Sequence, residues 1–137
     1  MKLFRSIAAL LRGGAPGFSV LESELLVEAQ RRLDAGRADQ LKRRVESVNL
    51  VQRLDGGREV NAYSIKNGKP AFDESLRLLG ENDERELAKF SFRTSDGRHY
   101  KGSIWLVNGQ LFSLEFDNIT EHILDCHPLD LDLSICI

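Results

Sequence analysis

The sequence predicts an α+β fold, in which two or three N-terminal helices pack on a curved antiparallel sheet of six to seven strands. Three observations predict it. Apolar residues recur at helical spacing as far as residue 48, they alternate with polar residues from residue 49 onward, and glycine-containing turns separate the alternating segments. Helices followed by hairpins are typical of this class. We expect the strands to form two hairpin meanders.

The length of 137 residues predicts a single domain with a core that needs no disulfide bonds. Residues 1–17 are expected to form an amphipathic helix and a Gly/Pro hinge, residues 18–48 the helical part, and residues 49–137 the sheet part. Two cysteines, Cys126 and Cys136, are too few for a disulfide framework. They indicate free thiols in a reducing cytoplasm, and we therefore expect a cytoplasmic protein.

The first helix has one broad apolar face and basic flanks. The face consists of Leu3, Phe4, Ile7, Leu10 and Leu11. Its uncharged run is shorter than the apolar region of a signal peptide, and no segment of the chain is long enough to cross a bilayer. We expect this face to dock on protein, because amphipathic helices mostly do, and contact with a membrane surface is the weaker alternative.

Two further helices are predicted before residue 49. Ser19 and Glu22 form a capping box, and Gly36 is expected to end the helix that starts there. The next helix has an apolar stripe at Leu41, Val45 and Val48, and Lys42, Arg43 and Arg44 are expected to face water. A nucleic-acid contact is the weaker alternative for this basic cluster, because no aromatic residue interleaves it. We therefore expect no nucleic-acid partner.

Turn sequences set the expected strand pairing. Asp55-Gly56-Gly57 and Asn67-Gly68 each join two strands of the first meander, and Pro70 predicts an edge strand. In the second meander, two-residue loops at Asp96-Gly97 and Asn108-Gly109 place Arg93 opposite Tyr100 and Trp105 opposite Phe112. One face then collects the expected core residues, which are Phe90, Phe92, Trp105, Val107, Phe112, Leu114 and Phe116.

The opposite face of the second meander is the candidate binding surface. It is graded from an apolar end to a charged end, with a hollow expected at Gly102. Its candidate residues are Lys89, Arg93, Tyr100, Glu115, Asp117, Ile104, Leu106 and Leu111. The alternative is that the apolar end packs inside the protein and that the charges are ordinary cross-strand pairs.

The sequence contains no constellation that predicts catalysis, a metal site or a cofactor. His122 and His127 are five residues apart, which would separate them by roughly 140° on a helix, and no second ligand pair has zinc-finger spacing. We interpret these histidines and Cys126 as structural.

The net charge of −2 combines +4 over residues 1–58 with −6 over residues 59–137, and we expect the two parts to lie against each other.

These observations favour a small non-enzymatic binding protein that acts through a sheet face or the hairpin rim. At the level of fold alone, helices followed by a hairpin-rich sheet resemble small bacterial toxin-neutralising immunity proteins and the NTF2-like pocket fold. The alternative function is a ligand-binding or enzymatic pocket between sheet and helices, with Tyr100, Glu115, Asp117 and His122 as its polar groups. The expected partner is another protein, or a second copy that pairs through the last strand, residues 129–137.

Overall fold

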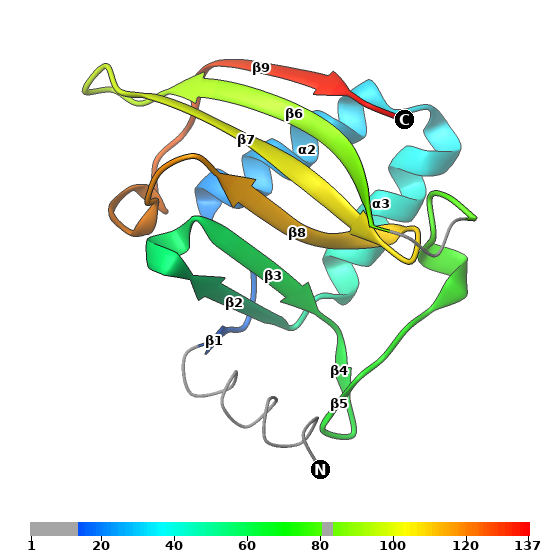
Figure 1. The fold of residues 1–137 in the computed structure, drawn as a ribbon. Coiled ribbons are helices and arrows are strands. Elements are labelled where there is room, and N and C mark those ends of the chain that lie inside the picture. The colour runs from blue at the N-terminus through cyan, green and yellow to red at the C-terminus, as the bar shows by residue number, and fades with distance from the viewer. Residues whose placement is uncertain (1–13, 81–83) are drawn as a thin grey trace.

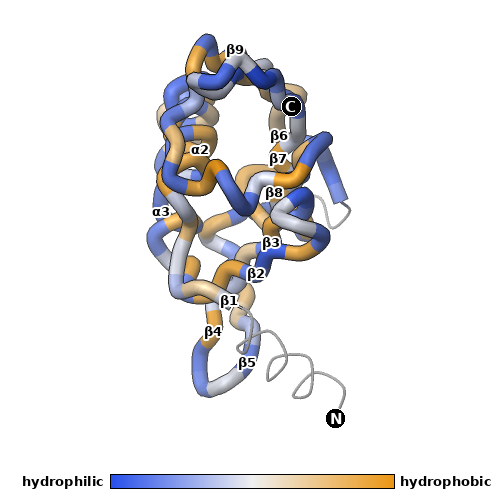
Figure 2. Tube along the Cα trace, turned by 90° about the vertical axis from the view of Figure 1, so that its left-hand side faces the viewer, coloured by the Kyte–Doolittle hydropathy of each residue, from blue (hydrophilic) through white to orange (hydrophobic). Residues whose placement is uncertain are grey.

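The computed structural model describes residues 14–80 and 84–137 of the chain. It is an α+β fold in which helices α2 (Val20–Arg32) and α3 (Ala35–Ser47) cover one face of an antiparallel sheet (Figure 1). Figure 2 shows these layers from the side, with the helices on one side and β6, β7 and β8 on the other. The fold class predicted from the sequence is confirmed.

Within the described residues the main sheet has seven strands in the order β1-β2-β3-β8-β7-β6-β9. Their bounds are β1 Gly14–Ala15, β2 Leu50–Leu54, β3 Glu59–Tyr63, β8 Gln110–Phe116, β7 His99–Val107, β6 Arg85–Arg93 and β9 Leu129–Ile135. A separate two-stranded sheet pairs β4 (Ile65–Lys66) with β5 (Lys69–Pro70), and it contains the edge strand predicted from Pro70. Short 3₁₀ turns occupy Asp55–Gly57, Glu74–Leu76 and Glu121–Ile123.

Residues 1–13, where the sequence predicts the N-terminal helix, lie outside the described residues. Residues 14–17 of the predicted hinge are described, and the first two of them form a strand. Gly14 and Ala15 form β1, which pairs with Gln52 and Val51 of β2 at one edge of the sheet. A glycine next to an alanine is compatible with extended backbone, and the partner strand supplies the hydrogen bonds that fix it.

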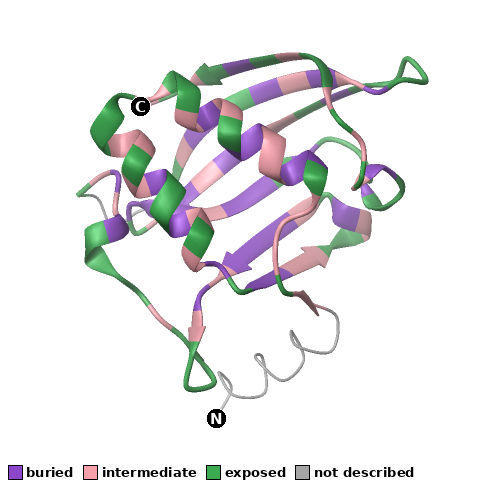
Figure 3. Cartoon of the chain, turned by 180° about the vertical axis from the view of Figure 1, so that it is seen from behind, coloured by how far each residue is buried: buried purple, intermediate pink, exposed green. Residues whose placement is uncertain are grey.

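The two described helices begin at side-chain caps. Ser19 and Glu22 form the predicted capping box, in which the Glu22 amide donates to the Ser19 hydroxyl at 3.2 Å and the Ser19 amide donates to the Glu22 carboxylate at 2.8 Å. Asp34 caps α3 by accepting from the Arg37 amide at 3.0 Å. The prediction that Gly36 ends the helix that begins at Ser19 is wrong, because α2 ends at Arg32 and Asp34 already caps α3. Buried residues of both helices face the sheet in Figure 3.

A buried ion pair joins α2 to the sheet. The Glu22 side chain has no exposed surface, and its two oxygens accept from Nε and Nη2 of Arg53 on β2 at 2.8 and 2.7 Å. The same carboxylate thus caps the helix and neutralises an arginine of the sheet. Both charged groups keep a partner when they leave water, as buried ions require.

The two Asn-Gly turns have the geometry that the sequence predicts. Asn67 and Gly68 have φ angles of 53° and 77°, and Asn108 and Gly109 have 52° and 82°, as a type I′ turn needs. The prediction for Asp96-Gly97 is wrong. Arg93 pairs with His99, so five residues form this loop, and the Thr94 amide donates to the Arg98 carbonyl at 2.9 Å.

This longer loop inverts the two faces of β7. A register shift of one residue moves every side chain of a strand to the other face. Tyr100, Ile104 and Leu106 therefore point into the core, and Trp105 and Val107 lie on the outer face. Gly102 pairs with Phe90, and a Cβ on Gly102 would lie 2.5 Å from the Phe90 ring, so the glycine provides the space for that ring.

A second irregularity changes the faces of β8. Leu106 pairs with Leu111 as predicted, but Trp105 pairs with Ser113, which leaves Phe112 as an extra residue in a β-bulge. Phe112 therefore leaves the expected core. The other expected core residues on β6 and β8 are confirmed as buried, and they are Phe90, Phe92, Leu114 and Phe116.

Candidate functional site

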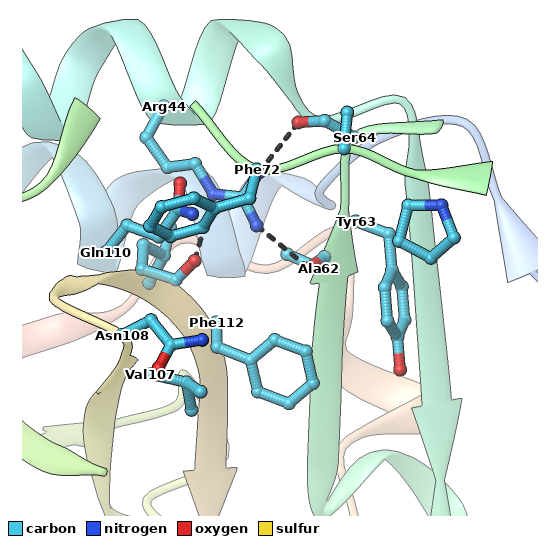
Figure 4. Close-up of a pocket in the computed structure, with 12 residues that line it drawn as sticks. Arg44, Ala62, Tyr63, Ser64, Phe72, Val107, Asn108, Gln110 and Phe112 are labelled. Carbon is cyan, nitrogen blue, oxygen red and sulfur yellow. Dashed lines mark hydrogen bonds between the residues drawn. The ribbon is translucent and has the colours of Figure 1, made fainter. Parts of the chain in front are cut away.

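A cavity of about 220 Å³ opens where β3 and β8 diverge (Figure 4). These strands are paired from Glu59 opposite Glu115 to Asn61 opposite Ser113, and the pairing stops there. Beyond that point the strands enclose a space at the hairpin rim, which we call the rim pocket. It is lined by Arg44, Ala62, Tyr63, Ser64, Pro70, Ala71, Phe72, Val107, Asn108, Gln110, Leu111 and Phe112.

Arg44 of α3 lies at the floor of the rim pocket and bridges the two diverging strands. Its Nε donates to the Leu111 carbonyl of β8 at 2.9 Å, and its Nη2 donates to the Ala62 carbonyl of β3 at 3.1 Å. Strands that separate lose the hydrogen bonds of the ladder, and buried carbonyls need other donors. The guanidinium supplies them from the helix layer.

A short hydroxyl relay completes the contacts of Arg44. Its Nη1 donates to the Ser64 hydroxyl at 2.7 Å, and the hydroxyls of Ser64 and Ser47 are 2.8 Å apart. The Ser47 hydroxyl donates to the Arg44 carbonyl at 2.7 Å. Since Ser47 has one hydroxyl hydrogen, Ser64 is the donor to Ser47. The relay therefore holds the guanidinium in one position.

Arg44 is a buried charge without a counter-ion. Its exposed fraction is 5%, and no carboxylate forms an ion pair with it in the part of the chain that the structure describes. Burial lowers the pKa of Arg44 to about 10, which still leaves the group protonated at neutral pH. The acceptors that it has are neutral oxygens, so its charge remains uncompensated.

Gln110 adds an unsatisfied polar group to the same floor. Its side chain is 5% exposed, and its Oε1 is buried without a hydrogen-bond partner in the described residues. Trp105 Nε1 shares this property but does not line the rim pocket. Buried polar atoms in folded proteins are nearly always paired with protein or with ordered water, so the donor to Gln110 Oε1 is water or a ligand in the cavity.

Aromatic side chains form the walls of the rim pocket. The rings of Tyr63 and Phe112 meet edge to face with centroids 5.5 Å apart, and Phe72 is 46% exposed at the rim. Burial, with a smaller effect from Glu59, raises the pKa of Tyr63, so its phenol stays neutral. The walls are therefore uncharged and suited to a planar apolar group.

The segment 70–79 contributes Pro70, Ala71 and Phe72 to the lining of the rim pocket. The Ala71 amide donates to the Ser64 carbonyl at 2.7 Å, and the Leu78 amide donates to the Gly109 carbonyl at 2.7 Å. A second hollow of about 270 Å³ lies beside the first and shares Arg44, Ser64, Ala71, Phe72 and Gln110 with it. The guanidinium is thus approached from two hollows.

The structure does not bring the sequence-predicted binding face together as one surface. Tyr100, Ile104, Leu106 and Leu111 are at most 1% exposed and belong to the core, so their assignment to an outer face is wrong. The five-residue loop before β7 and the bulge in β8 are the physical reason. Of these four, Leu111 reaches the site described above as a wall of the rim pocket.

The charged part of that predicted face does reach the outer surface. Lys89, Glu115 and Asp117 are exposed and line one shallow hollow together with Gly102. Arg93 lies farther along β6 and pairs with Asp130 of β9 at 2.9 Å. Binding of a partner through this surface stays a prediction.

The histidines and cysteines lie in separate local contacts. Nε2 of His122 is 3.3 Å from the Tyr100 hydroxyl, and Nδ1 of His127 is 2.7 Å from the Glu24 carboxylate. Burial raises the pKa of the Cys136 thiol, which keeps it protonated at neutral pH. Over residues 14–80 and 84–137, no group of three His, Cys, Asp or Glu side chains could hold a metal ion.

Sequence reasoning missed Arg44, which it assigned to a water-facing cluster with Lys42 and Arg43. Those two residues are exposed as predicted. Arg44 follows Leu41 by three residues and precedes Val48 by four, so it lies on the apolar stripe of α3. This spacing was the available signal, because a charged residue within a buried stripe needs partners in the core.

No helix in the described residues is both long enough and apolar enough to cross a membrane. Comparisons of the chain with protein-family models, with curated proteins and with solved structures found no match.

Proposed function

We propose that this chain is a non-enzymatic binding protein that takes up a small ligand in the rim pocket. One observation carries the proposal: the pocket combines aromatic walls with a floor where the buried Arg44 has no counter-ion and Gln110 Oε1 has no hydrogen-bond partner among the described residues. Small-molecule sites have this composition, in which apolar walls provide contact area and a few polar groups fix orientation.

The chemistry of the lining supports binding rather than catalysis. None of the described residues that line the rim pocket is a histidine, cysteine, aspartate or glutamate. Its one serine, Ser64, accepts from Arg44 and donates to Ser47, so its hydroxyl has no general base beside it. The lining therefore offers positioned donors and apolar walls, but no nucleophile–base pair.

The rim pocket also agrees with the hairpin rim as the expected location of binding. Tyr63 precedes the β4–β5 hairpin, and Asn108 lies at the tip of the β7–β8 hairpin. The alternative pocket expected around Tyr100 and Glu115 has less support. Tyr100 is buried, whereas Glu115 is exposed on the other face of the sheet.

The test is a ligand screen with a variant that fills the pocket. Ala71 is a half-buried wall residue, and Ala71→Phe would place a ring in the cavity. We expect a library of small metabolites, screened by ligand-observed NMR, to give hits with the wild-type chain that disappear with Ala71→Phe. Ala35→Phe at the exposed start of α3 is the matched control and should keep them. If Ala71→Phe removes no hit that Ala35→Phe keeps, the proposed function is wrong.

A further inference from the structure

Two hydrogen-bond donors of the Arg44 guanidinium have no acceptor among the described residues. A guanidinium carries five N–H groups in a planar fork. Three of them donate to the Leu111 carbonyl, the Ala62 carbonyl and the Ser64 hydroxyl. The other two have no partner in the described residues. They belong to a side chain that is 5% exposed and that lines the cavity, so water or a ligand in that cavity supplies their acceptor.

The charge of the lining determines the sign of that occupant. Among the described residues that line the rim pocket, Arg44 is the one with a formal charge. Asp73 and Glu74 line the second hollow, together with Lys66. The Asp73 carboxylate there accepts from the Ser75 amide and hydroxyl, at 2.9 and 2.7 Å. An anion is therefore attracted to the rim pocket, where Arg44 acts without a carboxylate beside it, more than to the second hollow, where two carboxylates oppose the cations.

Gln110 can complete the recognition of an anion. No hydrogen bond to the described residues holds either end of its amide, although the side chain is 5% exposed. The amide can therefore turn its NH₂ group toward an acceptor beside Arg44. Two N–H groups of a guanidinium and one of an amide match the two oxygens of a carboxylate. A dianionic phosphate would keep one negative charge uncompensated, because the pocket supplies one cation.

The size and walls of the pocket limit the rest of the ligand. The volume of about 220 Å³ is below the roughly 300–1,000 Å³ typical of sites for drug-sized molecules. Tyr63 and Phe112 already meet edge to face, and Phe72 stands at the rim. Such walls favour one planar ring, which can pack against them at the geometry that aromatic pairs prefer.

We infer that the ligand of the rim pocket is a small aromatic monocarboxylate. This inference rests on the proposed function and adds the chemical class of the ligand. Its carboxylate accepts from the two unused N–H groups of Arg44 and from the Gln110 amide, and its ring lies among Tyr63, Phe72 and Phe112. Binding supplies the counter-ion that the folded chain itself does not provide.

The test compares two probes of equal shape, phenylacetate and phenylacetamide, by NMR titration of the full chain. We expect phenylacetate to bind at least about tenfold more tightly, the ratio expected for hydrogen bonds between a guanidinium and a charged acceptor. Gln110→Glu would give Arg44 an internal counter-ion, so we expect it to abolish the preference for phenylacetate. Asn67→Asp adds the same charge at the exposed β4–β5 turn and should leave the preference unchanged.

The outcomes separate this inference from the proposed function. If the two probes bind equally and Ala71→Phe blocks both, the inference that the ligand is a carboxylate is wrong, and the proposal that the rim pocket binds a ligand stands. If neither probe binds, the hits of the metabolite screen decide: hits that carry a carboxylate support the inference, and hits without one overturn it. An absence of any hit that Ala71→Phe blocks would overturn both. Loss of the preference with Asn67→Asp would assign it to overall charge and overturn the inference.

Discussion

Two arginines connect the helices to the sheet, and only one of them has a counter-ion among the described residues. Arg53 of β2 meets the Glu22 carboxylate of α2 through two hydrogen bonds of 2.7 and 2.8 Å. Arg44 of α3 meets two carbonyls and a hydroxyl, and it has no ion pair with the described residues. The first contact is complete within the protein. The second leaves a charge and two donors beside a cavity, which is the arrangement that a bound anion would complete.

The largest expected effect on stability comes from breaking the ion pair between Glu22 and Arg53. Glu22→Gln would leave Arg53 without its counter-ion and weaken the cap of α2, so we expect the free energy of unfolding to fall by about 3 kcal/mol. This value is at the lower end of the range for buried pairs, because the Arg53 side chain is still 17% exposed. Urea unfolding at pH 7 measures it. A loss below about 1 kcal/mol would contradict a buried, structural pair.

The second-largest expected effect on stability comes from replacing Arg44, which has no counter-ion among the described residues. Arg44→Met would remove the donors of two buried carbonyls but also an uncompensated charge, so we expect a smaller loss of about 1–2 kcal/mol. Arg44→Lys keeps the charge and lacks the fork that reaches three acceptors, and it should destabilise the chain more than methionine does. Urea unfolding of both variants checks this order. A larger loss for Arg44→Met than for Glu22→Gln would show that the charge of Arg44 is compensated within the fold.

The smallest effect comes from a surface pair that serves as a reference. A hydrogen bond from Arg32 at 2.9 Å is the main cause that lowers the pKa of Glu28 from its ordinary value of 4.5. Because the folded state holds this proton less tightly, the stabilisation is present above about pH 4.5 and is lost as the pH falls through the lower folded value. We expect Glu28→Gln to cost about 0.3–0.5 kcal/mol at pH 7. Urea unfolding at pH 7 and at pH 3 measures it, and an undiminished difference at pH 3 would contradict this account.

Local signals in the sequence were sufficient for the fold class, the capping box and the two Asn-Gly turns. The capping box and the turns depend on residues at most a few positions apart, and the fold class depends on the spacing of apolar residues within each segment, so all three can be predicted without knowledge of distant contacts. The loop at Asp96 was predicted wrongly because Asp-Gly suits both a two-residue turn and a longer loop. In the structure, the Thr94 hydroxyl donates to the Asp96 carboxylate and the Thr94 amide pairs with Arg98, which favours the longer form.

The candidate site was missed because it depends on contacts between distant segments. The Arg44 guanidinium reaches Leu111 across 67 residues and Ala62 across 18. Its place on the stripe of Leu41 and Val48 indicated burial, but nothing in the local sequence indicated that β3 and β8 diverge above it. Such a gap follows from the strand order of the whole sheet, in which β3 and β8 are neighbours although they are far apart in the chain.

The pairing of β9 with β6 has a consequence for synthesis of the chain. β6 ends at Arg93 and its partner β9 ends at Ile135, so the outer edge of β6 can be fully paired only after the 42 residues from position 94 to position 135 have been translated. At typical elongation rates this takes roughly 2–8 s. Until β9 has docked, the backbone groups of β6 next to Phe90 and Phe92 have no partner at this edge. The speed with which β9 docks therefore sets how long this edge can pair with another chain.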